Sequence, residues 1–303
     1  MPTNVNSIHI DTLLSSISIK YRNTNFIAME VFPELPVKKT SDLYRVYDRN
    51  FRLPETLRAN RGKAREHTFE VSTGQYILAK HALKDYVSDT DADNYDLADL
   101  RADTTEELTD KILLRVEKSV ADLFTSTSWS QNVSLSAAQQ WSADTTTSNP
   151  IPQMDTAGLV VMEQSGFAKN IGIVPMRAML AAKNHTSIID RIKYTSIDIT
   201  PQMLAGLFDL PKMLVPGAVV DTSANGVASS ITPVWGDNVF VGYRAERPSP
   251  LKPSAGYVFR KSAPMVKRWR VEERESDAIE VGMEFQAKVV ASLAGYLIKD
   301  VLA

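Results

Sequence analysis

The residues able to bind a metal or to carry out acid–base chemistry are scattered along this chain. The four histidines, His9, His67, His81 and His185, show neither the HxxxH nor the HExxH spacing that places two imidazoles on one zinc ion. The chain contains no cysteine, which excludes disulfides, thiolate metal sites and a cysteine nucleophile. It also lacks the GxSxG motif of serine hydrolases and the GxG core of a dinucleotide-binding loop. We therefore expect no enzyme, no cofactor and no metal site, and we expect the histidines to be surface or packing residues.

One acidic stretch begins like a calcium-binding loop. Asp89, Asp91 and Asp93 occupy alternate positions in SDTDADN, as the first ligands of such a loop do. Asn94 stands where the sharp turn of that loop needs glycine, and Leu100 stands where a bidentate glutamate belongs. A solvated acidic loop is therefore the better interpretation, and a calcium loop the weaker one.

Charge is divided unevenly between two neighbouring parts of the chain. Residues 38–70 hold nine basic groups against five acidic ones, and residues 85–110 hold ten acidic groups against one, Arg101. These are either two solvated faces or complementary surfaces, with the basic stretch of one copy on the acidic stretch of the next. Nucleic acid is a weaker partner, because acidic and apolar residues interrupt the basic stretch. The candidate contact residues between copies are Arg52, Arg58, Arg61, Lys63, Arg65, Asp89, Asp91, Asp93 and Asp99.

The basic stretch is expected to be carried on an extended excursion of the chain. Residues 1–37 resemble an arm without a core of its own. Residues 38–80 contain strand-like runs at 43–47, 69–71 and 76–78, separated by a long polar tip. A lone hairpin is marginal in water, so this one is expected to lie on a neighbouring molecule.

The strongest periodic signals predict a long helix and a closing hairpin. Apolar residues recur at steps of three and four between Leu108 and Phe124, within a helix predicted over 97–125. Thr104 and Glu107 have capping-box spacing and could mark its strong part. From Ile279 to Val289 apolar and polar residues alternate, which predicts a strand paired with 265–272 across a turn at 274–277.

Composition places the chain among ordinary globular proteins. It has 303 residues, of which 44% are hydrophobic and 23% charged, with a formal net charge of −2. This balance argues against a general nucleic-acid coat formed by one basic surface. No apolar run approaches the roughly 18 residues of a membrane span. The first twenty residues lack the pattern of a secretory signal, so we expect the protein to be made and used in cytosol.

The central and C-terminal segments carry a family resemblance. Five pieces occur in order: NHTSIIDRIKYT (184–195), LAGLFDLPKML (204–214), VWGD (234–237), GYVF (256–259), and the stretch from Trp269 to Tyr296. Together with the arm, the excursion and the long helix, they resemble the major capsid proteins of tailed phages, the Hong Kong 97 (HK-97) type. The resemblance covers nearly the whole chain.

The resemblance implies an α+β phage capsid (HK-97-like) fold. It implies an N-terminal arm (1–37), an extended β-hairpin loop (38–80), a peripheral domain with a long spine helix (81–155), an axial domain (156–259) and closing strands of the peripheral domain (260–303). The implied function is a structural subunit of an icosahedral phage head. Copies would form pentamers and hexamers around packaged double-stranded DNA, after assembly in the host cytoplasm.

The same resemblance implies several partners. These are other copies of the chain, a separate scaffolding protein, a portal, a decoration protein and non-specific contact with the DNA, but no membrane. An encapsulin-like nanocompartment shell is the alternative within the fold. A cytosolic α/β hydrolase or transferase is the alternative from another class.

Overall fold

The structure is a computed structural model, and part of the chain is described by it. The described residues are 9–10, 14, 25–46, 53, 56–58, 62–64, 66, 72–95, 99–125, 129–143, 147–193, 199–224, 226–250 and 252–303.

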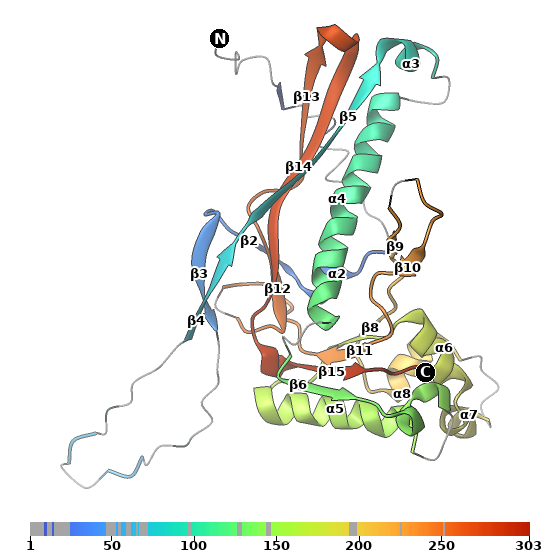
Figure 1. Ribbon diagram of the computed structural model, residues 1–303. Coiled ribbons are helices and arrows are strands. Elements are labelled where there is room, and N and C mark those ends of the chain that lie inside the picture. The colour runs from blue at the N-terminus through green and yellow to red at the C-terminus, as the bar shows by residue number, and fades with distance from the viewer. Residues whose placement is uncertain are drawn as a thin grey trace.

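A long helix lying along a long strand forms the spine of the molecule (Figure 1). Helix α4 (Leu100–Thr125) buries Ile112, Val116, Val120 and Phe124, which recur every four residues and so share one face. This face packs on β14 (Ser276–Val289) and β5 (Ala79–Ser88). The predicted apolar stripe and the predicted alternation of the closing strand are both confirmed.

The start of this helix differs from the capping-box prediction. Thr104 lies inside the helix, where its hydroxyl donates to the carbonyl oxygen of Leu100 at 2.7 Å. The side chain of Asp99 instead accepts a hydrogen bond from the backbone N–H of Arg101 at 3.0 Å. A hydroxyl one turn into a helix bonds back to the preceding turn, so spacing alone selected the wrong cap.

The spine strand belongs to a six-stranded sheet whose members come from distant parts of the chain. Its pairings are antiparallel except the one between β12 and β2, which is parallel. The strand order is β1 (His9–Ile10), β13 (Met265–Val271), β14, β12 (Gly256–Arg260) and β2 (Glu34–Pro36), with β5 also paired to β14. The described arm residues therefore add two strands to this sheet.

A five-stranded sheet forms the second part of the molecule and is buried on both faces. Phe240 and Leu297 face the core beneath α4, whereas Val239, Val241 and Ile298 face a second core. Burial on both faces explains why the central strands of this sheet, at 171–173 and 239–242, read as continuous apolar runs. The order is β6 (Gln131–Ser134), β15 (Gly295–Lys299), β11 (Val239–Gly242), β7 (Ile171–Ile173) and β8 (Met213–Leu214).

Four helices enclose the second core. Helix α5 (Pro150–Ser165) lies against β11 and β15, and ends at Gly166, whose φ of 68° is left-handed. Pro201 opens α8 behind Thr200, whose hydroxyl accepts from the N–H of Met203, as its N1-like position predicts. The other two helices are α6 (Met176–Asn184) and α7 (Thr186–Ile192). Short helices α2 (Ala28–Val31) and α3 (Asp89–Asp93) lie outside this core.

The two sheets cut across three of the predicted segments. Strand β12, assigned by sequence to the axial segment 156–259, pairs in the six-stranded sheet. Strand β15, assigned to the peripheral closing strands 260–303, pairs in the five-stranded sheet, as does β6 from 81–155. Non-local pairing decides all three cases, and the division into domains stays a prediction.

An aromatic cluster joins the end of α4 to the five-stranded sheet. The ring of Phe124 lies 4.7 Å from that of Phe240 and 5.4 Å from that of Trp129. Phe32, from the arm, lies 5.4 Å from Phe124, and Trp235 lies 5.2 Å from it. The two parts of the molecule and the arm therefore share one core, in which offset aromatic contacts add to apolar burial.

A buried carboxylate lies beside this cluster. Glu117 on α4 is 1% exposed, and it accepts hydrogen bonds from the backbone N–H groups of Ile27 (3.0 Å) and Ala28 (2.8 Å). It also accepts from the indole Nε1 of Trp235 at 2.6 Å. Burial raises the pKa of the Glu117 carboxyl, while these three donors act in the opposite direction. One side chain thus holds the arm, the spine helix and the loop before β11.

We predict that Val116→Asp destabilises the unassembled subunit by about 3 kcal/mol or more, because it places an unpaired charge between α4 and β14. Lys111→Asp, on the exposed face of the same helix, is the matched control and should change stability little. Urea unfolding of the two variants measures the difference. Equal stability of both variants would contradict the packing of this face.

We also predict that Trp235→Phe lowers the free energy of unfolding by about 1.5–3 kcal/mol, because it removes one donor to a buried charge but keeps an aromatic ring. Glu117→Ala should lower it further, since three buried donors lose their acceptor. In the Glu117→Ala background, Trp235→Phe should have a much smaller effect. Additive effects in this double-mutant cycle would show that the two side chains do not interact.

Candidate assembly surface

The predicted contact residues fall in two separate places. Asp89, Asp91 and Asp93 make up much of α3, directly after β5, and Asp99 precedes α4. We call the described acidic residues from Asp85 to Asp103 the acidic shoulder. It lies at one end of the molecule, beside the turn of the β13–β14 hairpin (Figure 1).

The basic candidates lie on the loop between β3 (Ser41–Val46) and β4 (Ser72–Ile77). These strands form the predicted antiparallel hairpin, with Leu43 opposite Gln75. Arg58 and Lys63 are described, and the Nε of Arg58 donates to the carbonyl oxygen of Gly62. Among the described residues, no ion pair joins either of them to the shoulder of the same copy. Arg52, Arg61 and Arg65 lie outside the described residues.

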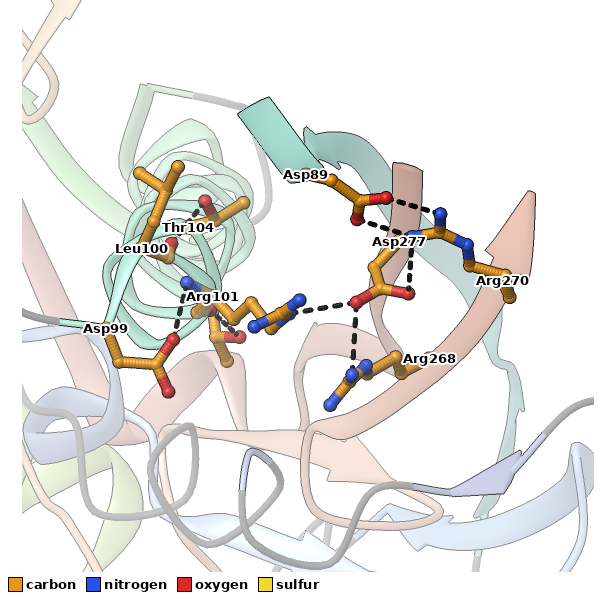
Figure 2. A network of polar contacts seen from close by, with 9 residues as sticks. Asp89, Asp99, Leu100, Arg101, Thr104, Arg268, Arg270 and Asp277 are labelled. Carbon is orange, nitrogen blue, oxygen red and sulfur yellow. Dashed lines mark hydrogen bonds and ion pairs between the residues drawn. The ribbon is translucent and has the colours of Figure 1, made fainter. Parts of the chain in front are cut away.

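Asp89 is held by an arginine that is distant in sequence (Figure 2). Arg270 on β13 donates from Nη1 and Nη2 to the two carboxylate oxygens of Asp89, at 2.6 and 2.5 Å. Two parallel bonds of this kind combine charge attraction with fixed geometry. These hydrogen bonds hold the pKa of Asp89 below its usual value, and they raise the pKa of Arg270.

Asp277 is the centre of the same network. It is 6% exposed and lies opposite Arg270 in the β13–β14 ladder. Its Oδ2 accepts from Arg101 Nε on α4 at 2.9 Å and from Arg268 Nη2 at 3.0 Å. Arg270 Nη1 lies 3.8 Å from its Oδ1. Figure 2 shows the three arginines converging on this carboxylate, so it joins the first turn of α4 to the sheet.

The other shoulder aspartates shape the local backbone. Ser88 caps α3 by accepting from the N–H of Asp91, and its hydroxyl donates to Asp91 Oδ2 at 2.6 Å. Asp99 caps α4, and Asp93 is exposed. The shoulder is therefore a preformed acidic surface, on which Asp91 and Asp93 point their charge to solvent more than Asp89 does.

Sequence reasoning missed the arginines that organise this surface. Arg268 and Arg270 alternate on one strand, and the turn after them brings Asp277 opposite Arg270. That cross-strand pairing could have been found from the hairpin prediction. The contact with Asp89, which is 181 residues away from Arg270, could not.

Two of the described histidines, His185 and His81, have packing roles. His185 is 3% exposed and lies between two serines, with Nε2 3.1 Å from Ser148 Oγ and Nδ1 2.7 Å from Ser187 Oγ. His81 stacks on Phe285 with ring centres 4.7 Å apart. Within the described ranges, no three His, Cys, Asp or Glu residues are grouped to hold a metal ion. No described helix is long and apolar enough to cross a membrane.

Comparison with known proteins gives two curated relatives. No family model matches the chain. The major capsid protein of Burkholderia phage BcepMu is 26% identical over 303 residues, which span 96% of each chain. The major capsid protein of Pseudomonas phage JBD67 is 30% identical over 244 residues, covering 78% of this chain and 77% of that one.

The chain belongs to the phage major capsid proteins.

Solved structures agree with this capsid fold. A phage-related protein from Bordetella bronchiseptica RB50 superposes with a TM-score of 0.80 at 25% identity, over 96% of this chain and 97% of that one. The capsid of cyanophage P-SCSP1u gives 0.62 at 10% identity, over 92% and 89% of the two chains. The SrpI encapsulin of Synechococcus elongatus gives 0.51 at 13% identity, over 93% and 90%, which shows the fold alone. The predicted α+β fold of HK-97 type is confirmed, and the capsid protein is a structural subunit of an icosahedral phage head in the virion.

We predict that Arg270→Met raises the pKa of Asp89 toward its ordinary value of 3.8, because the bidentate hydrogen bonds are lost. A depressed pKa means that the pair stabilises the fold above 3.8, and that this stabilisation is lost as the pH falls through the folded pKa. NMR titration of carboxyl groups in the unassembled subunit measures the shift. Arg274→Met is the control, and an unchanged Asp89 pKa in Arg270→Met would contradict the assignment.

Proposed function

We propose that this capsid protein assembles into pentamers and hexamers that enclose double-stranded DNA. The relatives are named as major capsid proteins, and relatives of this kind work as shells of many copies. Residues 156–259 would act as the axial domain around each ring, and the region around α4 and the six-stranded sheet as the peripheral domain. Assembly would take place in the host cytoplasm, and the capsid protein would catalyse no reaction of its own.

We further propose that the basic loop of one copy docks on the acidic shoulder of the next. The described loop residues Leu53 and Leu57 are 89% and 84% exposed, so the loop has apolar surface that a neighbouring copy would cover in such a contact. The loop is basic and the shoulder is acidic, so the two surfaces are complementary. The basic side chains of the loop would face Asp91 and Asp93, while Asp89 and Asp99 hold the shoulder in shape. These basic residues are Arg52, Arg58, Arg61, Lys63 and Arg65.

Other partners follow from the family. We propose a separate scaffolding protein, a portal and a decoration protein as binding partners. Contact with the packaged DNA would be non-specific, because contacts to phosphates carry no sequence information, and weak, because a net charge of −2 provides no general basic surface.

The likeness to phage capsid proteins in sequence is the observation that carries this proposal. An encapsulin-like shell shares the fold, but the curated relatives over nearly the full chain are phage proteins. Electron microscopy of the purified protein, with and without the scaffolding protein, is the direct test. Closed shells or ring-shaped capsomers support the proposal, whereas a strictly monomeric species at high concentration would overturn it.

We predict that replacing Arg58, Arg61 and Arg65 by Glu blocks or slows assembly and leaves the subunit fold intact, because like charges then face each other. Each exposed pair is worth only about 0.2–1 kcal/mol, but every copy in a ring repeats the contact. Light scattering follows assembly, and high salt should weaken it for the wild type.

Rescue of this variant gives the matching control. Asp91→Lys with Asp93→Lys in the same chain should restore part of the assembly and keep the Asp89–Arg270 pair. Glu106→Lys with Glu107→Lys, a pair of equal charge on α4, should not restore it. If the loop variant assembles normally, or both pairs rescue equally, the charges are solvated faces.

A further inference from the structure

Two hairpins stand outside the two large sheets. Strands β3 and β4 pair with each other, and so do β9 (Val219–Asp221) and β10 (Ile231–Pro233), each pair forming a two-stranded sheet of its own. In Figure 1 they occupy opposite flanks of the molecule, with β3–β4 to the left of β14 and β9–β10 to the right of α4. The acidic shoulder lies toward the same flank as β9–β10.

The β9–β10 hairpin has one covered and one uncovered face. Register pairs Val219 with Pro233 and Asp221 with Ile231, so these four side chains share a face. Val220 points to the opposite face and packs against the core beneath α4. On the shared face, Val219 is 53% exposed and Ile231 is 66% exposed.

The carboxylate of Asp221 accepts hydrogen bonds from the loop that joins the two strands of the hairpin. Its Oδ1 accepts from the N–H of Ser223 (2.9 Å), the hydroxyl of Ser223 (2.7 Å) and the N–H of Ser230 (3.0 Å). These hydrogen bonds lower the pKa of Asp221 to about 2. The carboxylate therefore preorganises the loop, and the uncovered face combines this ionised group with the aliphatic side chains of Val219, Ile231 and Pro233.

The β3–β4 hairpin repeats this arrangement on the other flank. Tyr44 and Tyr76 cover its inner face by packing on Phe259, with ring centres 5.2 and 4.7 Å apart. Its outer face carries Leu43 and Ile77, which are 63% and 57% exposed. Both hairpins thus leave aliphatic side chains in water, where short two-stranded sheets are only marginally stable.

A closed ring of identical subunits brings opposite flanks together. In such a head-to-tail contact, a surface on one flank of each copy meets a different surface on the other flank of its neighbour. We propose that the outer face of β9–β10 in one copy packs on the outer face of β3–β4 in the next copy around the ring. This contact rests on the proposed ring assembly. Because it is aliphatic, it should persist at salt concentrations that weaken the charged contact.

Cysteine cross-linking tests this contact directly, since the chain has no cysteine of its own. A variant with both Leu43→Cys and Ile231→Cys should give, after oxidation of assembled particles, a ladder of covalent oligomers up to a complete ring. Each single variant should give at most a dimer. The control combines Leu43→Cys with Leu83→Cys, because Leu83 on β5 is also exposed, at 42%, lies outside the proposed axial domain and should give no ladder.

Assembly of a charged variant gives a second measurement. Ile231→Asp should raise the protein concentration needed for assembly about tenfold or more, because the uncovered face can no longer be buried without cost. Leu83→Asp, at a residue 42% exposed on β5 and outside the proposed axial domain, should raise it less than about twofold. Normal assembly of Ile231→Asp would overturn the contact.

The outcomes separate this inference from the ring assembly beneath it. Particles that form without the Leu43–Ile231 ladder would overturn the hairpin contact and leave the proposed assembly standing. Wild-type protein that forms neither rings nor shells would overturn the assembly and the hairpin contact together.

Discussion

The three hydrogen bonds to the Glu117 carboxylate constrain how the rest of the subunit is arranged. A buried carboxylate is tolerated only where donors surround it, and its donors come from the arm, at Ile27 and Ala28, and from the loop that carries Trp235. Because Glu117 lies on α4, the helix stands between these two segments and joins them at this site. The carboxylate therefore fixes where the arm crosses the spine helix and where the five-stranded sheet begins.

The same end of α4 carries the aromatic cluster, whereas its other end carries the Arg–Asp network. Phe124 packs on Phe240 near the C-terminal end, and Arg101 bonds Asp277 in the first turn. The helix is thus attached to one sheet along its length, and to the second sheet only at its far end. Helix α4 therefore packs in one core with residues of both sheets.

The sequence predicted the parts whose pattern is local and strongly periodic. The stripe around Val116 and the alternation from Ile279 gave the helix and the closing strand, because each pattern reports which face is buried. The long helix was predicted to begin near 97, and the structure starts it at Leu100, with Asp99 as its cap. Strand β15 could not be assigned to its sheet, since its partners β6 and β11 lie far away in the chain. Glu117 was missed because a glutamate beside an apolar stripe gives no sign of its three distant donors.

At the candidate surface too, the sequence located the acidic residues but did not show what each of them contacts. Composition identified an acidic stretch, but the structure shows that its members differ in kind. Asp89 is bound by Arg270 and Asp99 caps a helix, so their charges are partly compensated within the subunit. Asp89 and Asp99 fix the shape of this surface, and the exposed Asp91 and Asp93 supply its negative charge. Such a surface can bind a basic loop without first reorganising. Since each exposed ion pair is weak, such a contact would be easily reversed while copies are still being added. Burial of aliphatic side chains would then supply the part of the contact that does not depend on salt.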